Sequence, residues 1–229
     1  VTMQGSSIWG AADDWIERAL PFASEELEVA PADIEFTEGE FRVAGTDKSL
    51  DVMALVDRAR GKGRTELLSE QRENTVPGRS FPNGCHVCEV EVDAETGVTQ
   101  VVKYTVVDDF GVLMNPMLAE GQVHGGVAQG IGQALMEDCV YDADGQPLTG
   151  SFMDYQMPRA ADLSAFDLAL NEVPCLTNPL GVKGCGEAGS IAAPPAVIDA
   201  VLAALSDYGV TDIQMPAPPR RIWEAMHRA

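Results

Sequence analysis

The residue whose setting is most suited to chemistry is Glu187, within the stretch NPLGVKGCGEAGS at 178–190. Glycines at 181, 184, 186 and 189 interrupt this stretch. Glycine is favoured where the backbone needs positive φ or where another group must come close. The stretch therefore indicates a loop built against a bound group, with the carboxylate facing that group. A glutamate shielded from water there could serve as a general base. On spacing alone, a solvated loop glutamate stays an open alternative.

A second glycine-rich stretch, GVAQGIGQAL, lies in a segment of helical character, and together with the preceding Gly125 it places Gly125, Gly126, Gly130 and Gly132 within about two turns. Each glycine inside a helix costs about 1 kcal/mol relative to alanine. We therefore expect this helix to pack unusually closely, either against another helix or against a flat or phosphorylated ligand at its start. In the second case, Gln129 would offer an amide suited to the edge of a heterocycle.

Two other pairs have a spacing that can bind metal. Cys85 and Cys88 are spaced like a zinc or redox pair, but no second pair follows, and at the entry of a strand their odd separation puts them on opposite faces. We expect one buried and one half-exposed thiol, and no metal ligand set in the chain. Glu120 and His124, four residues apart on a helix, could share a face and hold a cation. A structural histidine is the stronger expectation.

The loop also contains a G-x-G-x-x-G pattern, formed by Gly184, Gly186 and Gly189. A dinucleotide-binding turn needs a strand before this pattern and a second strand that ends in an acid. Pro179 interrupts the first, and GVTDIQMPAPP stands where the second should be. A phosphate-binding P-loop is excluded too, because no serine or threonine follows Lys183.

The elements that must position these residues begin with a helix over 7–20, which Pro21 ends or offsets. DIEFTEGEFRVAG alternates around Glu38-Gly39 and predicts a hairpin. SLDVMALVDRAR returns to helical spacing, with Ser49 placed to cap it. The polar, Gly- and Pro-containing segment that follows divides the chain into 1–75 and 76–229.

Beyond that boundary, HVCEVEVDAETGVTQVVKYTVVDDFG predicts a long hairpin that turns at 93–97. Helices are predicted over 119–137, over 194–208 with prolines at its start, and from about Pro219. Hairpins and helices without regular alternation favour an α+β fold over a doubly wound sheet.

Composition narrows the function. The 229 residues carry a formal charge of −21, which would repel a phosphate backbone and argues against nucleic acid as a partner. No apolar run reaches the roughly 20 residues of a membrane span, and the first residues lack a signal-peptide pattern. Five scattered cysteines indicate no disulfide framework. We expect a cytoplasmic protein, and since the sequence starts at Val1, a fragment of a longer chain.

Taken together, the segments resemble the C-terminal part of the molybdopterin-binding large subunit of the xanthine oxidase and aldehyde oxidase family. Within it they are most similar to aerobic carbon monoxide dehydrogenase-like proteins. The resemblance is collinear and is carried by FPNGCHVCEVEVDAETG, VDDFGVLMNP, EGQVHGGVAQGIGQALMED, YDADGQPLTGSFMDYQMP, NPLGVKGCGEAGSIAAPPAV and IQMPAPPRRIWEA. It implies a molybdenum-cofactor-binding domain in which hairpins pack against glycine-rich and amphipathic helices.

The resemblance also implies roles for single residues. Glu187 matches the catalytic base, which takes the proton from a molybdenum-bound hydroxyl as that oxygen attacks an electron-poor carbon. Gln129, with Gly130 beside it, matches the glutamine that hydrogen-bonds the cofactor. Cys185 and Gly186 match the backbone that lines the metal's pocket, although valine is more usual at the position of Cys185. In bacterial relatives the cofactor is usually molybdopterin cytosine dinucleotide.

The same resemblance implies partners. The upstream part of the large subunit, an iron–sulfur subunit carrying 2Fe-2S and a flavin subunit carrying FAD would complete the enzyme, assembled as a dimer of heterotrimers. The substrate would be carbon monoxide, or alternatively an aldehyde or an N-heterocycle. A non-catalytic assembly module is the alternative from another class. We expect the chain alone to be inactive.

Overall fold

The computed structural model describes residues 2–75 and 77–228. It divides into two compact units, Val1–Gly78 with Asn178–Leu180, and Arg79–Thr177 with Gly181–Ala229. Each unit has a hydrophobic core of its own. Helices and two small sheets occur in mixed order, which confirms the predicted α+β class. In the described residues, no helix is both long and apolar enough to cross a bilayer.

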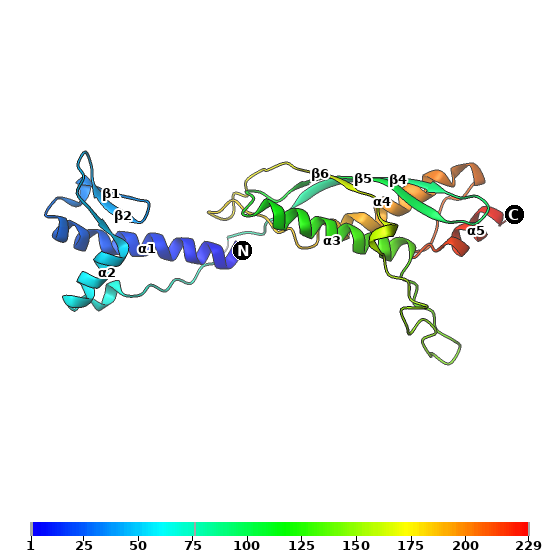
Figure 1. Ribbon diagram of the computed structural model, residues 1–229, viewed down its shortest axis with the longest axis horizontal. Helices are drawn as coiled ribbons and strands as arrows, with labels where there is room; N and C mark the ends of the chain where they lie inside the picture. Colours follow the sequence, from blue (N-terminus) through cyan, green and yellow to red (C-terminus); the bar gives the residue numbers. More distant parts are fainter. Residues whose placement is uncertain (1, 76, 229) are drawn as a thin grey trace. The chain divides into compact units, whose positions relative to one another are not determined.

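The N-terminal unit contains a long helix, a three-stranded antiparallel sheet and a short helix (Figure 1). Its elements are α1 (Thr2–Leu27), η1 (Pro31–Asp33), β1 (Ile34–Thr37), β2 (Glu40–Val43), β3 (Ser49–Asp51), α2 (Val52–Gly61) and η2 (Thr65–Leu67). The predicted hairpin is confirmed: β1 and β2 pair around Glu38 and Gly39, which both have positive φ. Phe22, Phe41 and Leu55 are among the side chains that fill the core of this unit.

Two local predictions in this unit were wrong. Helix α1 does not end at Pro21, the first of the two predicted outcomes, but continues to Leu27, because Phe22 and Leu27 bury their side chains in the core and so outweigh the lost backbone hydrogen bond. Ser49 does not cap α2, since it belongs to β3. The cap is Asp51, whose side chain accepts a 2.9 Å hydrogen bond from the amide of Ala54.

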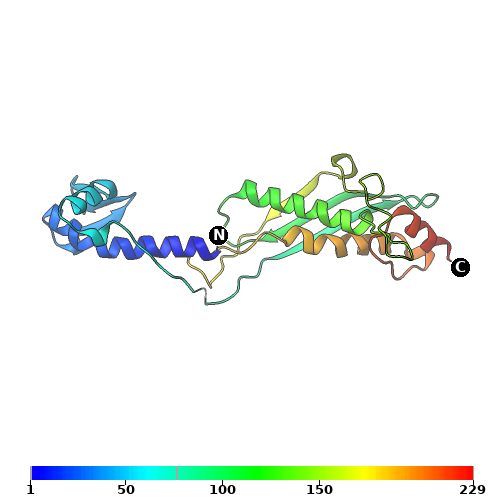
Figure 2. The ribbon, with the colours of Figure 1, turned by 90° about the horizontal axis from the view of Figure 1, so that it is seen from below.

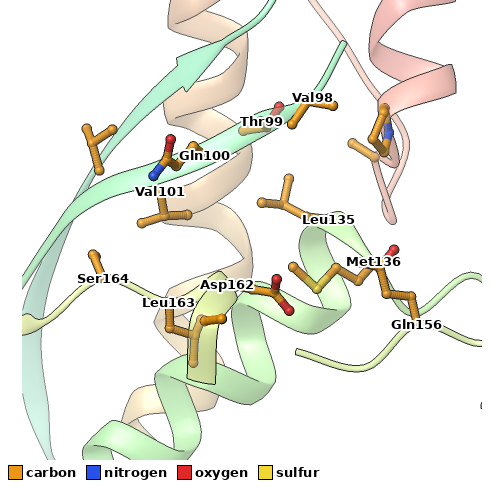
Figure 3. A pocket seen from close by; sticks show the side chains of 14 residues that line it. Val98, Thr99, Gln100, Val101, Leu135, Met136, Gln156, Asp162, Leu163 and Ser164 are labelled. Atoms are coloured by element: carbon orange, nitrogen blue, oxygen red, sulfur yellow. The ribbon is translucent and has the colours of Figure 1, made fainter. Parts of the chain in front are cut away.

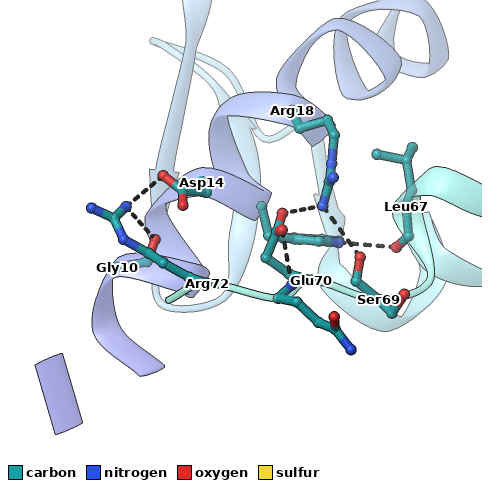
Figure 4. Close-up of polar contacts among 9 residues, drawn as sticks. Gly10, Asp14, Arg18, Leu67, Ser69, Glu70 and Arg72 are labelled. Carbon is teal, nitrogen blue, oxygen red and sulfur yellow. Dashed lines mark hydrogen bonds and ion pairs between the residues drawn. The ribbon is translucent and has the colours of Figure 1, made fainter. Parts of the chain in front are cut away.

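The segment after η2 is fastened to α1 by side chains of the helix (Figure 4). The indole of Trp15 donates to the carbonyl of Leu67 at 2.9 Å, and Arg18 pairs with Glu70. Arg72 pairs with Asp14 at 2.7 Å and also donates to the carbonyl of Gly10. Residues 67–72 therefore belong to the N-terminal unit.

The C-terminal unit places two helices along one face of a three-stranded sheet of order β4-β5-β6 (Figures 1 and 2). Its elements are β4 (Asn83–Val92), β5 (Thr99–Asp109), α3 (Pro116–Leu135), η3 (Ala160–Asp162), β6 (Phe166–Leu170), α4 (Ala188–Ala204), η4 (Ser206–Tyr208) and α5 (Pro219–His227). The hairpin β4–β5 is antiparallel and turns at 93–97 as predicted, whereas β6 joins β5 in parallel. Strand β6 was not predicted.

Both central helices have bounds that differ from those predicted. Helix α3 starts earlier, at Pro116, because the side chain of Asn115 caps it by accepting from the amide of Leu118 at 3.1 Å. Helix α4 starts at Ala188, so that Pro194 and Pro195 lie inside it and not at its start. The first turns of α4 stay helical because they pack directly on α3. The predicted last helix is confirmed as α5.

Candidate active site

The glycine-rich loop at 181–187 is fixed by backbone bonds to the turn that follows β5. The amide of Val112 donates to the carbonyl of Gly181 at 2.9 Å, and the amide of Lys183 donates to that of Phe110 at 2.8 Å. Gly111 and Gly181 both have positive φ, and a Cβ added to Gly111 would collide with the carbonyl of Gly181. These two glycines thus bring two backbone segments together; they do not make room for a ligand.

Several glycines of α3 and α4 serve the contact between the two helices. A Cβ on Gly126 would lie 2.8 Å from the amide nitrogen of Ser190, and one on Gly130 would lie 2.5 Å from Cβ of Ala193. From the other side, a Cβ on Gly189 would lie 2.6 Å from the carbonyl oxygen of Val123. Close packing against a helix, the first of the two predicted explanations, therefore accounts for Gly126 and Gly130. The cofactor contact of Gly130 stays a prediction.

A different set of glycines faces open space. A Cβ added at 121, 125, 184 or 186 would meet no described atom within 4 Å. Gly121, Gly125 and Gln129 follow one another at intervals of four residues, and all three are exposed on α3. This exposed row of residues begins next to the loop, because Gln122, the neighbour of Gly121, donates from Nε2 to the carbonyl of Gly186 at 2.8 Å. The helix and the loop together form a surface that a flat group can approach.

Glu187 stands at the junction of the loop and α4. It is exposed, it directly precedes the first helical residue, and its side chain does not cap the helix. Cys185, two residues earlier, is half-buried and packs on the core. Contacts therefore bring Cys185, Gly186 and Glu187 to the start of α3, whereas Gln129 lies roughly 10 Å further along that helix than Gln122.

The loop offers unpaired hydrogen-bond donors. Within the described ranges, the amides of residues 184–187 make no hydrogen bond, and the free amides of the first turn of α4 follow directly. A helix start with free amides favours anionic groups. With no Cβ at Gly184 and Gly186 to block approach, these donors fit the phosphate and pterin groups of a molybdenum cofactor.

Beneath the loop lies a buried ion pair between Lys183 and Asp109. Lys183 Nζ is 2.5 Å from Asp109 Oδ2, and the two side chains are only 9% and 11% exposed. The other oxygen of Asp109 accepts from the amides of Gly111 at 2.8 Å and Val173 at 3.1 Å. Burial alone would raise the pKa of Asp109, but the bonds from Lys183 and the two amides lower it below its ordinary value. Lys183 is thus committed to Asp109 and not to Glu187.

The two pairs with a spacing that could bind metal, Glu120 with His124 and Cys85 with Cys88, do not form a metal site in the described residues. His124 lies against the ring of Phe166, with centroids 5.6 Å apart. Cys85 is exposed and Cys88 is half-buried on the opposite face of β4, so that neither is the fully buried thiol we expected. Burial raises the pKa of Cys88 to about 11, which keeps this thiol protonated and unreactive. No group of three or more possible metal ligands occurs in the described part of the chain.

A separate cavity of about 490 Å³ lies where the start of β5 faces the end of α3 and the segment before β6 (Figure 3). Thr99, Leu135, Asp162 and Ser164 are among its lining residues, and the hydroxyls of Thr99 and Ser164 are buried without a hydrogen-bond partner among the residues that the structure describes. It contains none of the predicted site residues.

Sequence reasoning missed Gln122 and Asp109. Gln122 stands beside Gly121 in the same glycine-rich helix as Gln129, so its position was a usable signal. Asp109 gave none, because its partners Val173 and Lys183 come 64 and 74 residues later in the chain.

Comparison with known proteins identifies a cofactor-binding family that matches most of this chain. Residues 1–164 match the family described as "Molybdopterin cofactor-binding domain". The 6-hydroxypseudooxynicotine dehydrogenase complex subunit gamma of Paenarthrobacter nicotinovorans is 33% identical over 96% of this chain and 28% of its own length. Because the match to the subunit gamma covers 96% of this chain, it extends past residue 164 and includes the loop at 181–187.

Two solved structures are similar over nearly the whole chain. Reconstituted CO dehydrogenase from Oligotropha carboxidovorans superposes with a TM-score of 0.88 at 29% identity, covering 96% of this chain and 28% of that one. Quinoline 2-oxidoreductase from Pseudomonas putida 86 gives 0.81 at 35% identity, covering 94% and 28%. The chain therefore spans about 28% of the length of these relatives.

Proposed function

Because the chain belongs to the molybdopterin cofactor-binding domain family, we propose that it holds the cofactor of a molybdenum hydroxylase large subunit and supplies its base, Glu187. The observation that carries this proposal is the exposed carboxylate at the start of α4, next to unpaired amides and open glycine backbone. The relatives reported above include a dehydrogenase and an oxidoreductase by their descriptions.

Each part of the site has a task in this proposal. The unpaired amides of 184–187 and the start of α4 bind anionic oxygens of the cofactor, and Gln129 hydrogen-bonds its heterocycle. Gln122 holds the carbonyl of Gly186 and so fixes the turn before the base. When bound, the cofactor would supply an oxidising metal centre for the two-electron oxidation of the substrate carbon, with water as the source of oxygen. Glu187 accepts the proton released from that oxygen as the new bond to carbon forms.

The complete enzyme is proposed to need more than this chain. The site as described is open, and a base works best where water is excluded. The rest of the large subunit would cover it, with a 2Fe-2S subunit and an FAD subunit removing the electrons in a dimer of heterotrimers. The cofactor would be the cytosine dinucleotide form. The isolated chain should give no turnover.

Two substrate classes have support. Carbon monoxide is proposed from the structural likeness to CO dehydrogenase, with a TM-score of 0.88. An aromatic N-heterocycle is the second candidate, since the quinoline enzyme is 35% identical to this chain. Assaying the complete enzyme with carbon monoxide and with quinoline separates them: turnover of one and not the other assigns the class, and turnover of neither rejects both.

Substitution of Glu187 tests the proposed role. In the complete enzyme, Glu187→Gln should lower kcat by a factor of 10²–10⁴, the contribution typical of a general base, while molybdenum content stays at the wild-type level. Glu120→Gln is the matched control, because Glu120 is an exposed glutamate on α3 of the same unit. If Glu187→Gln keeps its rate and loses stability instead, the loop is a packing element and the chain an assembly module.

A further inference from the structure

The ion pair of Asp109 and Lys183 holds the start of the loop that carries Glu187. Lys183 is the fourth residue before Glu187, and its ammonium is held at 2.5 Å from a carboxylate that is itself buried. In this ion pair the side chains of both the lysine and the aspartate are about nine-tenths buried. Such a pair has little freedom to rearrange, because separating it would leave a charge without a partner.

Asp109 joins three segments that are far apart in the sequence. One oxygen holds Lys183, while the other accepts from Gly111 in the turn after β5 and from Val173 after β6. The amide of Lys183 is itself bonded to the carbonyl of Phe110. Both the main chain and the side chain of Lys183 are therefore fixed to the end of β5.

Between Lys183 and the base, Cys185 packs on the core and the carbonyl of Gly186 accepts from Gln122, but no ion pair holds this span in the described residues. A Cβ added to Gly184 or Gly186 would meet no described atom within 4 Å. The side chain of Glu187 makes no hydrogen bond in the described part of the chain. The position of the carboxylate is therefore set from the two ends of this short span. One end is Lys183, and the other is the contact of Gly186 with Gln122 and of Gly189 with α3.

We propose that Asp109 is a positioning residue for the base, acting through Lys183 to fix the start of the Glu187 loop. This inference rests on the function proposed above. It predicts that loss of the Asp109 charge moves the loop without removing any group that touches substrate or cofactor. A misplacement of about 1 Å at a reacting group can cost on the order of 10²-fold in rate.

The test uses Asp109→Asn in the complete enzyme. We expect kcat to fall 10- to 100-fold with a smaller change in KM, at wild-type molybdenum content. In the enzyme prepared without molybdenum, hydrogen exchange of a peptide spanning 181–191 should become faster. Asp167→Asn is the matched control, because Asp167 pairs with Lys103 across β5 and β6 at 3.5 Å but lies at the exposed surface. It should leave kcat and loop exchange unchanged.

A double-variant cycle tests the route through Lys183. Lys183→Met should give a similar loss, and Asp109→Asn combined with Lys183→Met should be no worse than the more affected single variant. Additive losses would overturn the inference. If Asp109→Asn does not fold, Lys183→Gln carries the test with the same expected results, because it leaves the bonds of Asp109 to Gly111 and Val173 in place.

The outcomes separate this inference from the function on which it rests. If Glu187→Gln abolishes turnover while Asp109→Asn keeps wild-type kcat and loop exchange, Asp109 has no positioning role and the base assignment stands. If Glu187→Gln keeps wild-type turnover, the proposed function is overturned whatever Asp109→Asn does. Loss of kcat in Asp109→Asn without faster exchange at 181–191 would also reject positioning.

Discussion

Gly125 and Gly130 have the same side chain and lie on the same helix, but their surroundings are opposite. A methyl group added at Gly125 would meet open space, whereas one added at Gly130 would lie 2.5 Å from Cβ of Ala193. In sequence both belong to one glycine-rich run, and the run alone left helix packing and ligand approach as equal explanations. The structure shows close packing at Gly130 and open space at Gly125, where the approach of a ligand stays a prediction.

These two glycines give a matched pair of substitutions. Gly130→Ala should destabilise the C-terminal unit by about 1–3 kcal/mol, because the added methyl group overpacks the α3–α4 contact. Gly125→Ala should stabilise it by about 1 kcal/mol through helix propensity. Urea denaturation of both variants measures the change. If Gly125→Ala destabilises the unit instead, the added methyl group must collide with a neighbouring group, which would contradict the open space at Gly125.

Asp109 makes stability depend on pH in a defined direction. Its pKa is lowered below the ordinary value of 3.8, so its contribution to stability is complete above that pH and is lost as pH falls through the folded-state pKa. Asp109→Asn should cost about 3–5 kcal/mol near neutral pH, the usual result of breaking a buried pair. It should also flatten the stability profile below pH 3.8. Urea denaturation between pH 3 and pH 7 tests both; an unchanged acid limb would contradict the assignment.

A functional residue could be predicted when its neighbours in the sequence mark it. It could not be predicted when its partners lie far away in the sequence. Glu187 stood out because glycines flank it, and the family resemblance then supplied a role. Asp109 could not stand out, since an aspartate after a strand is common and its partners follow 64 and 74 residues later. Sequence patterns describe neighbours along the chain, while this pair depends on the fold.

At the scale of elements, the prolines of α4 show where local rules failed. We predicted that they begin a helix, yet both lie inside α4. Pro194 is buried, and its ring lies at 2.9 Å from a Cβ added to Gly130, so it contributes to the helix contact. Tertiary packing against α3 thus outweighs the backbone bond that each proline removes.

Pro195, in contrast, is exposed and contributes no such packing. Pro195→Ala should restore an amide donor for the carbonyl of Ile191 and stabilise the unit by roughly 1–3 kcal/mol. Pro194→Ala is the paired control and should gain less or lose stability, because it removes buried volume at the contact with α3. Thermal unfolding of the two variants decides: a larger gain for Pro194→Ala would mean that its ring contributes little to packing.

The hairpins were predictable because alternation and turn residues are local signals. Strand β6 was not, although FDLAL alternates, because its pairing is parallel and follows a long connection that includes α3. Only five residues carry the signal, which is too short to separate a strand from a loop. Its partner, β5, was needed to recognise it.

At the scale of the whole molecule, the two cores are separate clusters of side chains. Arg72 is held by Asp14 and Gly10 in the N-terminal unit, while Arg79 is exposed at the first residue of the C-terminal unit. Brief trypsin digestion should therefore cut first after Arg79 and yield fragments 1–79 and 80–229, identified by mass. Arg79→Gln should remove this first cut. Earlier cleavage after Arg58 or Arg60, both on α2, would contradict the arrangement of the N-terminal core.

The family could be identified from sequence because several motifs occur in the same order as in its members. The order of motifs along the chain is independent of the exact ends and caps of the helices. The placement of side chains beneath the loop required the fold, since no motif contains both Asp109 and Lys183.

The long sequence separation of the Asp109 contacts has a consequence for the order of folding. Closing loops of 64 and 74 residues costs more chain entropy than closing the β4–β5 hairpin, and the parallel pairing of β6 adds a further non-local step. The β4–β5 hairpin and α3 can therefore form before the Glu187 loop is fixed. The loop is then among the last parts of this unit to assemble.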